Sequence, residues 1–343
     1  MIPGLQSSDL DVARGDKFGH TALQYAIRRE HSEVVKILAK AGGTSNNAPD
    51  RHGQTLLHYA IWNRSLEAVE ALLTTDIDVN AQDKSGYTGV FLASALRPRP
   101  EILKVLLEHG ANPDLPLQSP PLYEIVSCGA TGSNSIECFN LLLAANANIN
   151  VQVGTFRWTP LHEAAAHRQK EYLKLLLDAK ADISLRDQWG RTAIELAIAI
   201  DYGIAVTLIL ETKPDLNVWG PEGCTYLHFA VVHRSIESMK LLLEAGADVN
   251  ARDKDGWTPL HYVAGKDLEQ TEWQSRREIL QVLLKANADV NAETKEGMNA
   301  LTLALEREDV NLDAEGINLL LEGLGDSEKG GLCGNLEDFW LPK

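Results

Sequence analysis

The chain has 343 residues, 44% of them hydrophobic, and a net charge of -16 at pH 7. This length allows a large buried core, whereas so acidic a chain is repelled by nucleic acid and by anionic lipid. No apolar run approaches the roughly 20 residues of a membrane span. Residues 1–8 also lack the charged start and apolar stretch of a secretory signal. We therefore expect no direct binding to nucleic acid or membrane.

The cysteines and the other reactive residues give no sign of a chemical site. Cys128, Cys138, Cys224 and Cys333 form no close metal-binding or redox pair, so we interpret them as reduced thiols of an intracellular protein. Its expected location is the cytoplasm, the nucleus or both. The sequence contains no phosphate-binding glycine loop, nucleophile elbow or zinc-ligand spacing. We expect no catalytic residue, no metal and no cofactor.

The amino end already shows internal similarity. Residues 11–16 (DVARGD) align with residues 248–253 (DVNARD), so the chain opens on what looks like the end of an earlier repeat. Terminal repeats of a stacked array need a polar outer face. Two interpretations stay open: the chain is a piece of a longer array, or a short segment serves as its cap.

From there a start signal recurs about every 33 residues, and in its fullest form it reads Thr-Pro-Leu-His-x-Ala, as in residues 159–164. Its Thr is suited to cap a helix, and the Pro suits the first helical position. The positions of this signal are Thr21, Thr55, Thr88, Pro120, Thr159, Thr192, Thr225, Thr258 and Asn299.

Each signal is followed by a predicted pair of helices. The first helix supplies one apolar residue to the core, at Leu23, Leu57, Val90, Leu122, Leu161, Ile194, Leu227, Leu260 and Leu301. Three residues later a small residue, usually Ala, permits close helix approach. The second helix is rich in Leu and usually stops at Gly or Asn, which tolerate the left-handed conformation. Because Asp76, Lys180 and Lys213 take that place in three repeats, we expect those helix ends to be looser or differently closed.

The period and the Thr-Pro-Leu-His-x-Ala core resemble the ankyrin repeat family from about residue 10 to residue 324. The resemblance implies an all-α solenoid of helix-turn-helix repeats joined by β-hairpin loops. About nine repeats start near residues 16, 50, 83, 115, 154, 187, 220, 253 and 294. Residues 325–343 form a Gly-rich C-terminal tail whose acidic and aromatic segment, residues 336–341, is either a docking motif or a cover for the last repeat.

Two repeats contain insertions between their helices, around residues 127–134 and 266–273. Insertions in repeat arrays commonly lie on one face, often a binding face, although loops without a partner are equally compatible with this pattern. His58, His162, His228 and His261 occupy the fourth place of the start signal, where the family uses histidine to brace the turn. We interpret these histidines as structural.

The resemblance also implies where a partner would bind. Ankyrin repeats place partner contacts on the hairpin tips and on the exposed end of the first helix. Five of the seven tryptophans occur at such places, and Trp, Tyr and Arg dominate interface energetics. The alternative is that Trp158, Trp189 and Trp257 only stack between successive hairpins. The predicted contact residues are Phe18, Arg28, Arg29, Arg51, Trp62, Tyr87, Phe156, Trp158, His167, Trp189, Arg191, Trp219, His233 and Trp257.

These features predict a non-enzymatic scaffold or adaptor that binds a partner protein through the concave ankyrin groove. The basic residues near the amino end suggest a partner with a carboxylate-rich segment. An ankyrin-type transcriptional coregulator, which also binds protein, is one alternative, and an enzyme with a pocket on the ankyrin scaffold is another. Asn80, Asn150, Asn250 and Asn291 stand in contexts that resemble those accepted by asparaginyl hydroxylases, although their ordinary role is to hydrogen-bond the backbone between hairpins.

Overall fold

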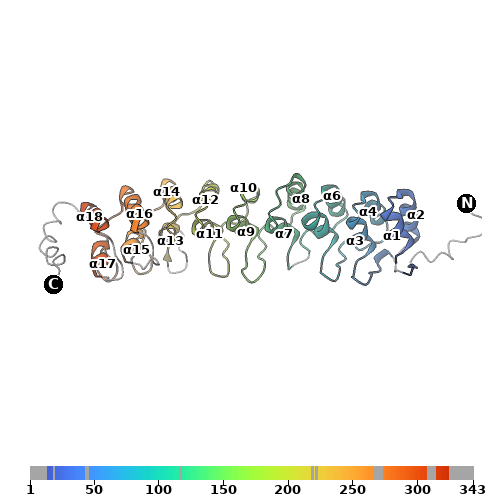
Figure 1. Ribbon diagram of the computed structural model, residues 1–343, viewed down its shortest axis with the longest axis horizontal. Coiled ribbons are helices and arrows are strands. Elements are labelled where there is room, and N and C mark those ends of the chain that lie inside the picture. Colours follow the sequence, from blue (N-terminus) through green and yellow to red (C-terminus); the bar gives the residue numbers. More distant parts are fainter. Residues whose placement is uncertain are drawn as a thin grey trace, which may run out of the picture. The chain divides into compact units, whose positions relative to one another are not determined.

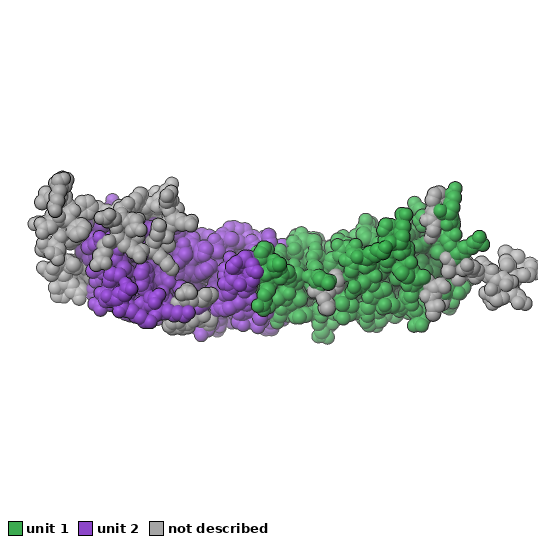
Figure 2. All heavy atoms as spheres, turned by 90° about the horizontal axis from the view of Figure 1, so that it is seen from below, with its two compact units in different colours: residues 1–164 green, residues 165–343 purple. Residues whose placement is uncertain are grey.

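The computed structural model describes residues 14–17, 20–42, 46–115, 118–217, 220, 223–265, 273–306 and 314–323. The chain divides into two compact units, residues 1–164 and residues 165–343 (Figure 2). Each unit consists of successive helix pairs that pack against the pairs before and after them (Figure 1). The tail beyond residue 323 lies outside the described residues.

Unit 1 contains the repeats up to the start of the fifth. Its second repeat, for example, pairs α3 with α4, and α4 packs in turn on α2 and α6. In the third repeat the first helix changes from α-helical to π-helical geometry within the stretch from Gly89 to Leu96. The elements are α1 (Ala22–Arg28), α2 (Ser32–Gly42), α3 (Leu56–Trp62), α4 (Leu66–Leu73), α5 (Gly89–Phe91), the π-helical segment η2 (Leu92–Leu96), α6 (Pro100–Glu108), α7 (Pro121–Ser127) and α8 (Ser133–Ala144). Helix α9 (Pro160–Ala166) spans the boundary between the units.

Unit 2 continues with the same arrangement of first and second helices. The first helices α11, α13, α15 and α17 contact one another in order, as do the second helices α10, α12, α14, α16 and α18. The elements are α10 (Lys170–Asp178), α11 (Ala193–Ala199), α12 (Gly203–Leu210), α13 (Tyr226–Val232), α14 (Ile236–Glu244), α15 (Pro259–Gly265), α16 (Trp273–Lys285), α17 (Ala300–Glu306) and α18 (Ala314–Gly323).

The core is the one that the repeat predicts. The apolar residue after each start signal is at most 3% exposed, from Leu23 to Leu301. The residue three positions later is also buried in every repeat; it is Ala in seven repeats, and Ile125 and Val263 take its place in the other two. Each buried leucine contributes about 1.5–3 kcal/mol of hydrophobic free energy. Because each repeat buries its helices only against its neighbours, the hydrophobic core extends along a unit as a continuous layer and is not gathered at one central point.

The start signal folds into a hydrogen-bonded cap. The Oγ1 atom of Thr55 lies 2.9 Å from His58 Nδ1, while His58 Nε2 lies 2.9 Å from the carbonyl oxygen of Tyr87 in the next repeat. His228 and His261 make the corresponding bonds to the carbonyl oxygens of Trp257 and Ala292. The interpretation of these histidines as structural is therefore correct: His58, His228 and His261 each join their own helix start to the following hairpin, and His162 caps its own helix start through Thr159.

The second-helix ends partly contradict the expectation drawn from their sequence. Lys180 and Lys213 adopt the left-handed conformation, with φ of 62° and 55°. The chain after Lys180 closes as it does after Gly110, since the N–H groups of Ala181 and Ala111 each bond to a carbonyl oxygen in the last turn of the helix before them. For Lys180 the predicted looser or different closure is wrong, because an L-residue can adopt this conformation at a cost of roughly 1–2 kcal/mol. Lys213 is followed by Pro214, which has no N–H to make the same bond, so that helix end is closed differently, as predicted. Asp76 has no positive φ, and its helix is closed by the N–H of Thr75 bonding to Leu72 O.

Four of the described loops between repeats are tight turns built on an aspartate. In the loop of residues 83–87, Asp83 Oδ1 accepts the N–H groups of Ser85 and Tyr87, and Gly86 takes a φ of 82°. The loops beginning at Asp50, Asp187 and Asp253 repeat this geometry. The part of the chain that the structure describes forms no strand, only an isolated antiparallel bridge between Val153 and Trp158.

Candidate protein-binding surfaces

The hairpin tip of residues 187–191 presents the most exposed predicted aromatic side chain. Trp189 is 50% exposed, and the guanidinium of Arg191 stacks 4.6 Å from its ring centroid. Arg191 Nη2 also lies 2.8 Å from Asp187 Oδ2. Burial opposes ionisation of Asp187, but the hydrogen bonds and charge of Arg191 and the N–H of Trp189 hold its pKa below the ordinary value. The pair therefore fixes Arg191 against the exposed indole.

The end of α13 lies close to this tip. His233 is exposed at the end of the helix, with its ring centroid 4.3 Å from that of Phe229. Partial burial and the positive charges of Arg191 and Arg234 lower the pKa of His233. The charge of Arg191 thus reaches the imidazole of His233 on the first helix of the next repeat, and a shared contact surface of Trp189, Arg191 and His233 stays a prediction.

His167 and Ile200 take the place of His233 in the preceding repeats of unit 2, and both are exposed. Arg168 links these two repeats: its Nη2 donates to the carbonyl oxygen of Ile200 over 2.6 Å, and its guanidinium stacks 5.3 Å from the Tyr202 ring. Arg168, which follows His167 in the chain, thus connects the first-helix ends of these two repeats.

Other predicted aromatics pack against the protein. Trp257 contacts the rings of His261 and Tyr262 and lies on Gly265, where an added Cβ would come within 2.9 Å of the indole. Tyr87 stacks on Phe91 at 4.5 Å. Trp257 and Tyr87 are partly buried, and each packs on the first helix of its own repeat; for Trp257 these contacts differ from the predicted stacking between successive hairpins.

In unit 1 the hairpin of residues 153–158 presents a second exposed aromatic. Phe156 is 49% exposed, and Trp158, partly buried, lies 5.9 Å from it. Arg51 is exposed at an earlier tip, where its Nε donates to His52 Nε2. Phe18 and Trp219 lie outside the described residues.

The first-helix ends of unit 1 form a basic group. Arg28 and Arg29 are exposed at the end of α1, and the guanidinium of Arg97 lies 4.8 Å over the ring of Trp62 at the end of α3. Arg64 follows in the same turn. The sequence interpretation missed Arg64 and Arg97; the spacing of nine residues after Thr55 and Thr88 was the signal that could have found them.

The asparagines predicted as modification sites hold neighbouring loops together. Asn80 Oδ1 accepts the N–H of Asn112 over 2.7 Å in unit 1, and Asn250 Oδ1 accepts the N–H of Asp289 over 2.8 Å in unit 2. Asn150 is partly buried and Asn291 is exposed. For Asn80 and Asn250 the structural role is thus present, and hydroxylation stays a prediction.

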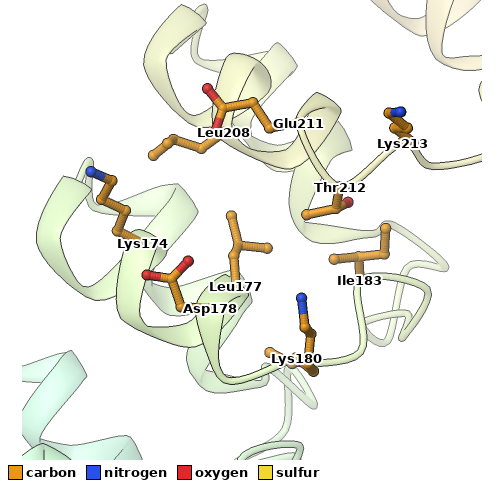
Figure 3. Close-up of a pocket in the computed structure, with 10 residues that line it drawn as sticks. Lys174, Leu177, Asp178, Lys180, Ile183, Leu208, Glu211, Thr212 and Lys213 are labelled. Atoms are coloured by element: carbon orange, nitrogen blue, oxygen red, sulfur yellow. The ribbon is translucent and has the colours of Figure 1, made fainter.

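A cavity of about 530 Å³ opens between α10 and α12 of unit 2. Apolar groups from Leu177, Ile183 and Leu208 line it together with charged side chains (Figure 3). The charged residues are Lys174, Asp178, Lys180, Glu211 and Lys213. Among the described residues no cluster of His, Cys, Asp or Glu could hold a metal ion, and no helix there could cross a membrane.

Comparison with known proteins decides the family. The family model described as ankyrin repeats (3 copies) matches residues 4–83, 90–187, 125–218, 181–253, 196–273 and 227–329. The chain belongs to the ankyrin repeat family. This family is in general a non-catalytic module that binds protein partners, and the predicted all-α ankyrin fold is confirmed.

Several curated proteins are similar in sequence to part of this ankyrin-repeat chain. It is 29% identical over 194 residues to a putative palmitoyltransferase ZDHHC13 of Danio rerio, covering 56% of this chain and 30% of that protein. It is 33% identical over 200 residues to the B-cell lymphoma 3 protein homolog of Mus musculus, covering 56% and 42%. To the nuclear factor NF-kappa-B p105 subunit of Gallus gallus it is 30% identical over 189 residues, covering 53% and 19%. The chain thus spans less than half of the length of these relatives.

Proposed function

We propose that the chain is a non-enzymatic scaffold or adaptor that binds a partner protein through its hairpin tips and first-helix ends. The observation that carries this proposal is the group of Trp189, Arg191 and His233 in unit 2. It combines an indole that is 50% exposed with a guanidinium already fixed by Asp187. Trp and Arg are the residues that most often dominate interfaces, and a pre-organised surface loses little entropy on binding.

A catalytic alternative finds less support. The cavity between α10 and α12 combines lysine and carboxylate side chains with an apolar lining, and its chemistry includes no nucleophile paired with a base. The buried histidines are engaged in caps and interrepeat bonds. His58, His228 and His261 are therefore tied to structural roles.

Affinity capture with the whole chain as bait tests the proposal. The variant Trp189→Ala/His233→Ala should retain its helical circular dichroism but bind any true partner more weakly by at least about 2 kcal/mol. The matched control Ile204→Ala/Lys240→Ala removes one exposed apolar and one basic side chain from the second helices α12 and α14 of the same unit. Equal loss in both variants, or no loss in the first, would contradict the proposed surface.

The coregulator remains a second candidate, because two of the relatives are a B-cell lymphoma 3 protein homolog and a subunit named as a nuclear factor. An intracellular location, cytoplasmic or nuclear, belongs to the same proposal. Imaging of a tagged chain tests it: nuclear accumulation supports the coregulator, whereas exclusion from the nucleus favours a cytoplasmic adaptor. Intact-mass measurement after coexpression with an asparaginyl hydroxylase tests modification of Asn80, Asn150, Asn250 and Asn291.

A further inference from the structure

The ends of the first helices in unit 1 carry an unusual concentration of one residue type. Arg28 and Arg29 end α1, Arg64 follows α3, and Arg97 and Arg99 follow η2. We call these five residues the arginine edge. Four of them are exposed and Arg99 is partly buried. Because the whole chain has a net charge of -16, this positive group is opposite in sign to the net charge of the rest of the chain.

Repeat geometry places these residues side by side. Positions seven, eight and nine residues after the start signals hold Arg28, Arg29 and Glu30 in the first repeat, and Trp62, Asn63 and Arg64 in the second. The third repeat holds Ala95, Leu96 and Arg97. Helices α1 and α3 pack together, as do α3 and η2, and packed helices lie about 8–10 Å apart. Three repeats therefore present the edge over about 20 Å, the length of about six extended residues.

The arginines have no carboxylate partner within the described part of the chain. Its ion pairs involve other cations, although Glu30 lies within the same group and Glu67 and Glu101 begin the nearby helices α4 and α6. With no carboxylate bound to them among the described residues, the five guanidinium groups are available to the carboxylates of an external acidic segment, which they can bind through charge-assisted hydrogen bonds.

Two further features point to an occupant. Among the described residues, the buried Nε1 of Trp62 and the buried Nε of Arg99 donate to no acceptor, and each unsatisfied buried donor costs about 1–3 kcal/mol. Leu96 is 43% exposed between them along the chain. Arg97 is already ordered on the Trp62 ring, which reduces the entropy that it loses on binding. The edge thus combines cations with an apolar surface.

We propose that the arginine edge binds an extended acidic segment, about six residues long, of a partner protein that also carries an apolar side chain for Leu96 and Trp62. Guanidinium groups match carboxylates in planar, bidentate geometry. The negative charge of the whole chain repels long phosphate polymers. A short acidic segment interacts mainly with the positive charge of the arginine edge itself. This inference rests on the proposed function, because it names the partner chemistry of one part of the same protein-binding face.

Fluorescence anisotropy with the full chain tests the edge. The probe is a labelled peptide of sequence EELEEFEE, and its neutral counterpart is QQLQQFQQ. Arg64→Gln/Arg97→Gln should weaken binding of the acidic peptide at least about tenfold, or about 1.4 kcal/mol. Lys40→Gln/Lys104→Gln, which removes two exposed charges from the second helices α2 and α6, should change it less than about twofold. Circular dichroism verifies that both variants fold.

Several outcomes would overturn the assignment: no binding of the acidic peptide, equal binding of the glutamine peptide, or equal loss in the lysine control. Tighter binding of an oligouridine RNA of equal charge would make the edge a phosphate site instead. If the chain binds the peptide through the arginines but captures no protein, the arginine edge is supported and the proposed function is contradicted. If a captured partner is lost in Trp189→Ala/His233→Ala but not in Arg64→Gln/Arg97→Gln, the proposed function is supported and the arginine edge is contradicted.

Discussion

Among the described residues of unit 2, two hairpins carry a tryptophan, and the two side chains differ in exposure. Trp189 stands three residues before Thr192 and is 50% exposed, whereas Trp257 stands directly before Thr258 and packs on Gly265. Unit 1 follows the same rule: Phe156 is 49% exposed, while Tyr87 and Trp158 are partly buried. The place of an aromatic residue relative to the start signal therefore separates contact residues from packing residues.

The largest expected effect comes from removing the packed indole. Trp257→Ala deletes its contacts with His261, Tyr262 and Gly265, which should lower the free energy of unfolding by about 3 kcal/mol. Urea denaturation monitored by circular dichroism measures the change. A loss below about 1 kcal/mol would show that Trp257 contributes as little to stability as Trp189, and would contradict the distinction between packed and exposed hairpin tryptophans.

A smaller effect follows from closing the space under the indole. In Gly265→Ala the new Cβ would approach the Trp257 ring to 2.9 Å and Leu303 Cδ1 to 3.1 Å, so we expect a loss of about 1–2 kcal/mol from overpacking. In the Trp257→Ala background the same substitution should be close to neutral, because most of the crowding is gone. A double-mutant cycle in urea measures this coupling, and additive changes would contradict the packing.

Much of the fold could be predicted from the sequence, because the repeat period determines which residues face the core. The buried residues from Leu23 to Leu301 and the histidine caps follow directly from the Thr-x-Leu-His signal. The partial burial of Trp257 could not be predicted with the same confidence, since it depends on Gly265 eight residues later, across the first helix. The arginine edge needed a comparison of positions beyond the signal, where Arg64 and Arg97 stand nine residues after their start signals and Arg28 stands seven residues after its own.

The same two repeats also differ in the fourth residue of the start signal, which is Glu195 in one and His261 in the other. Burial raises the pKa of Glu195 despite the N–H of Thr192 and the charge of Arg186, and burial lowers the pKa of His261. The native state thus holds the proton on Glu195 more tightly than the unfolded state does, and holds the proton on His261 less tightly.

These shifts predict opposite pH dependences. Relative to Glu195→Gln, the wild type should lose stability as pH rises from the ordinary glutamate pKa of 4.5 through the raised native pKa. Relative to His261→Gln, it should lose stability as pH falls from 6.5 through the lowered native pKa. Urea denaturation of the three proteins across this range measures both differences. Slopes of the same sign would contradict one of the two shifts, because burial disfavours the charged form of both residues and therefore moves the two pKa values in opposite directions.

The smallest expected effect on stability belongs to Trp189→Ala. Its indole is half exposed, and among the contacts that it loses is the stacking with Arg191, worth about 0.5–1 kcal/mol at an exposed site. Arg191 keeps its 2.8 Å ion pair with Asp187, so the hairpin should retain its turn and the free energy of unfolding should fall by only about 0.5 kcal/mol. Urea denaturation next to Trp257→Ala provides the direct contrast. Because Trp189 contributes so little to the fold, any large loss of partner affinity in Trp189→Ala belongs to the interface itself, whereas a loss of stability matching that of Trp257→Ala would assign both indoles to packing.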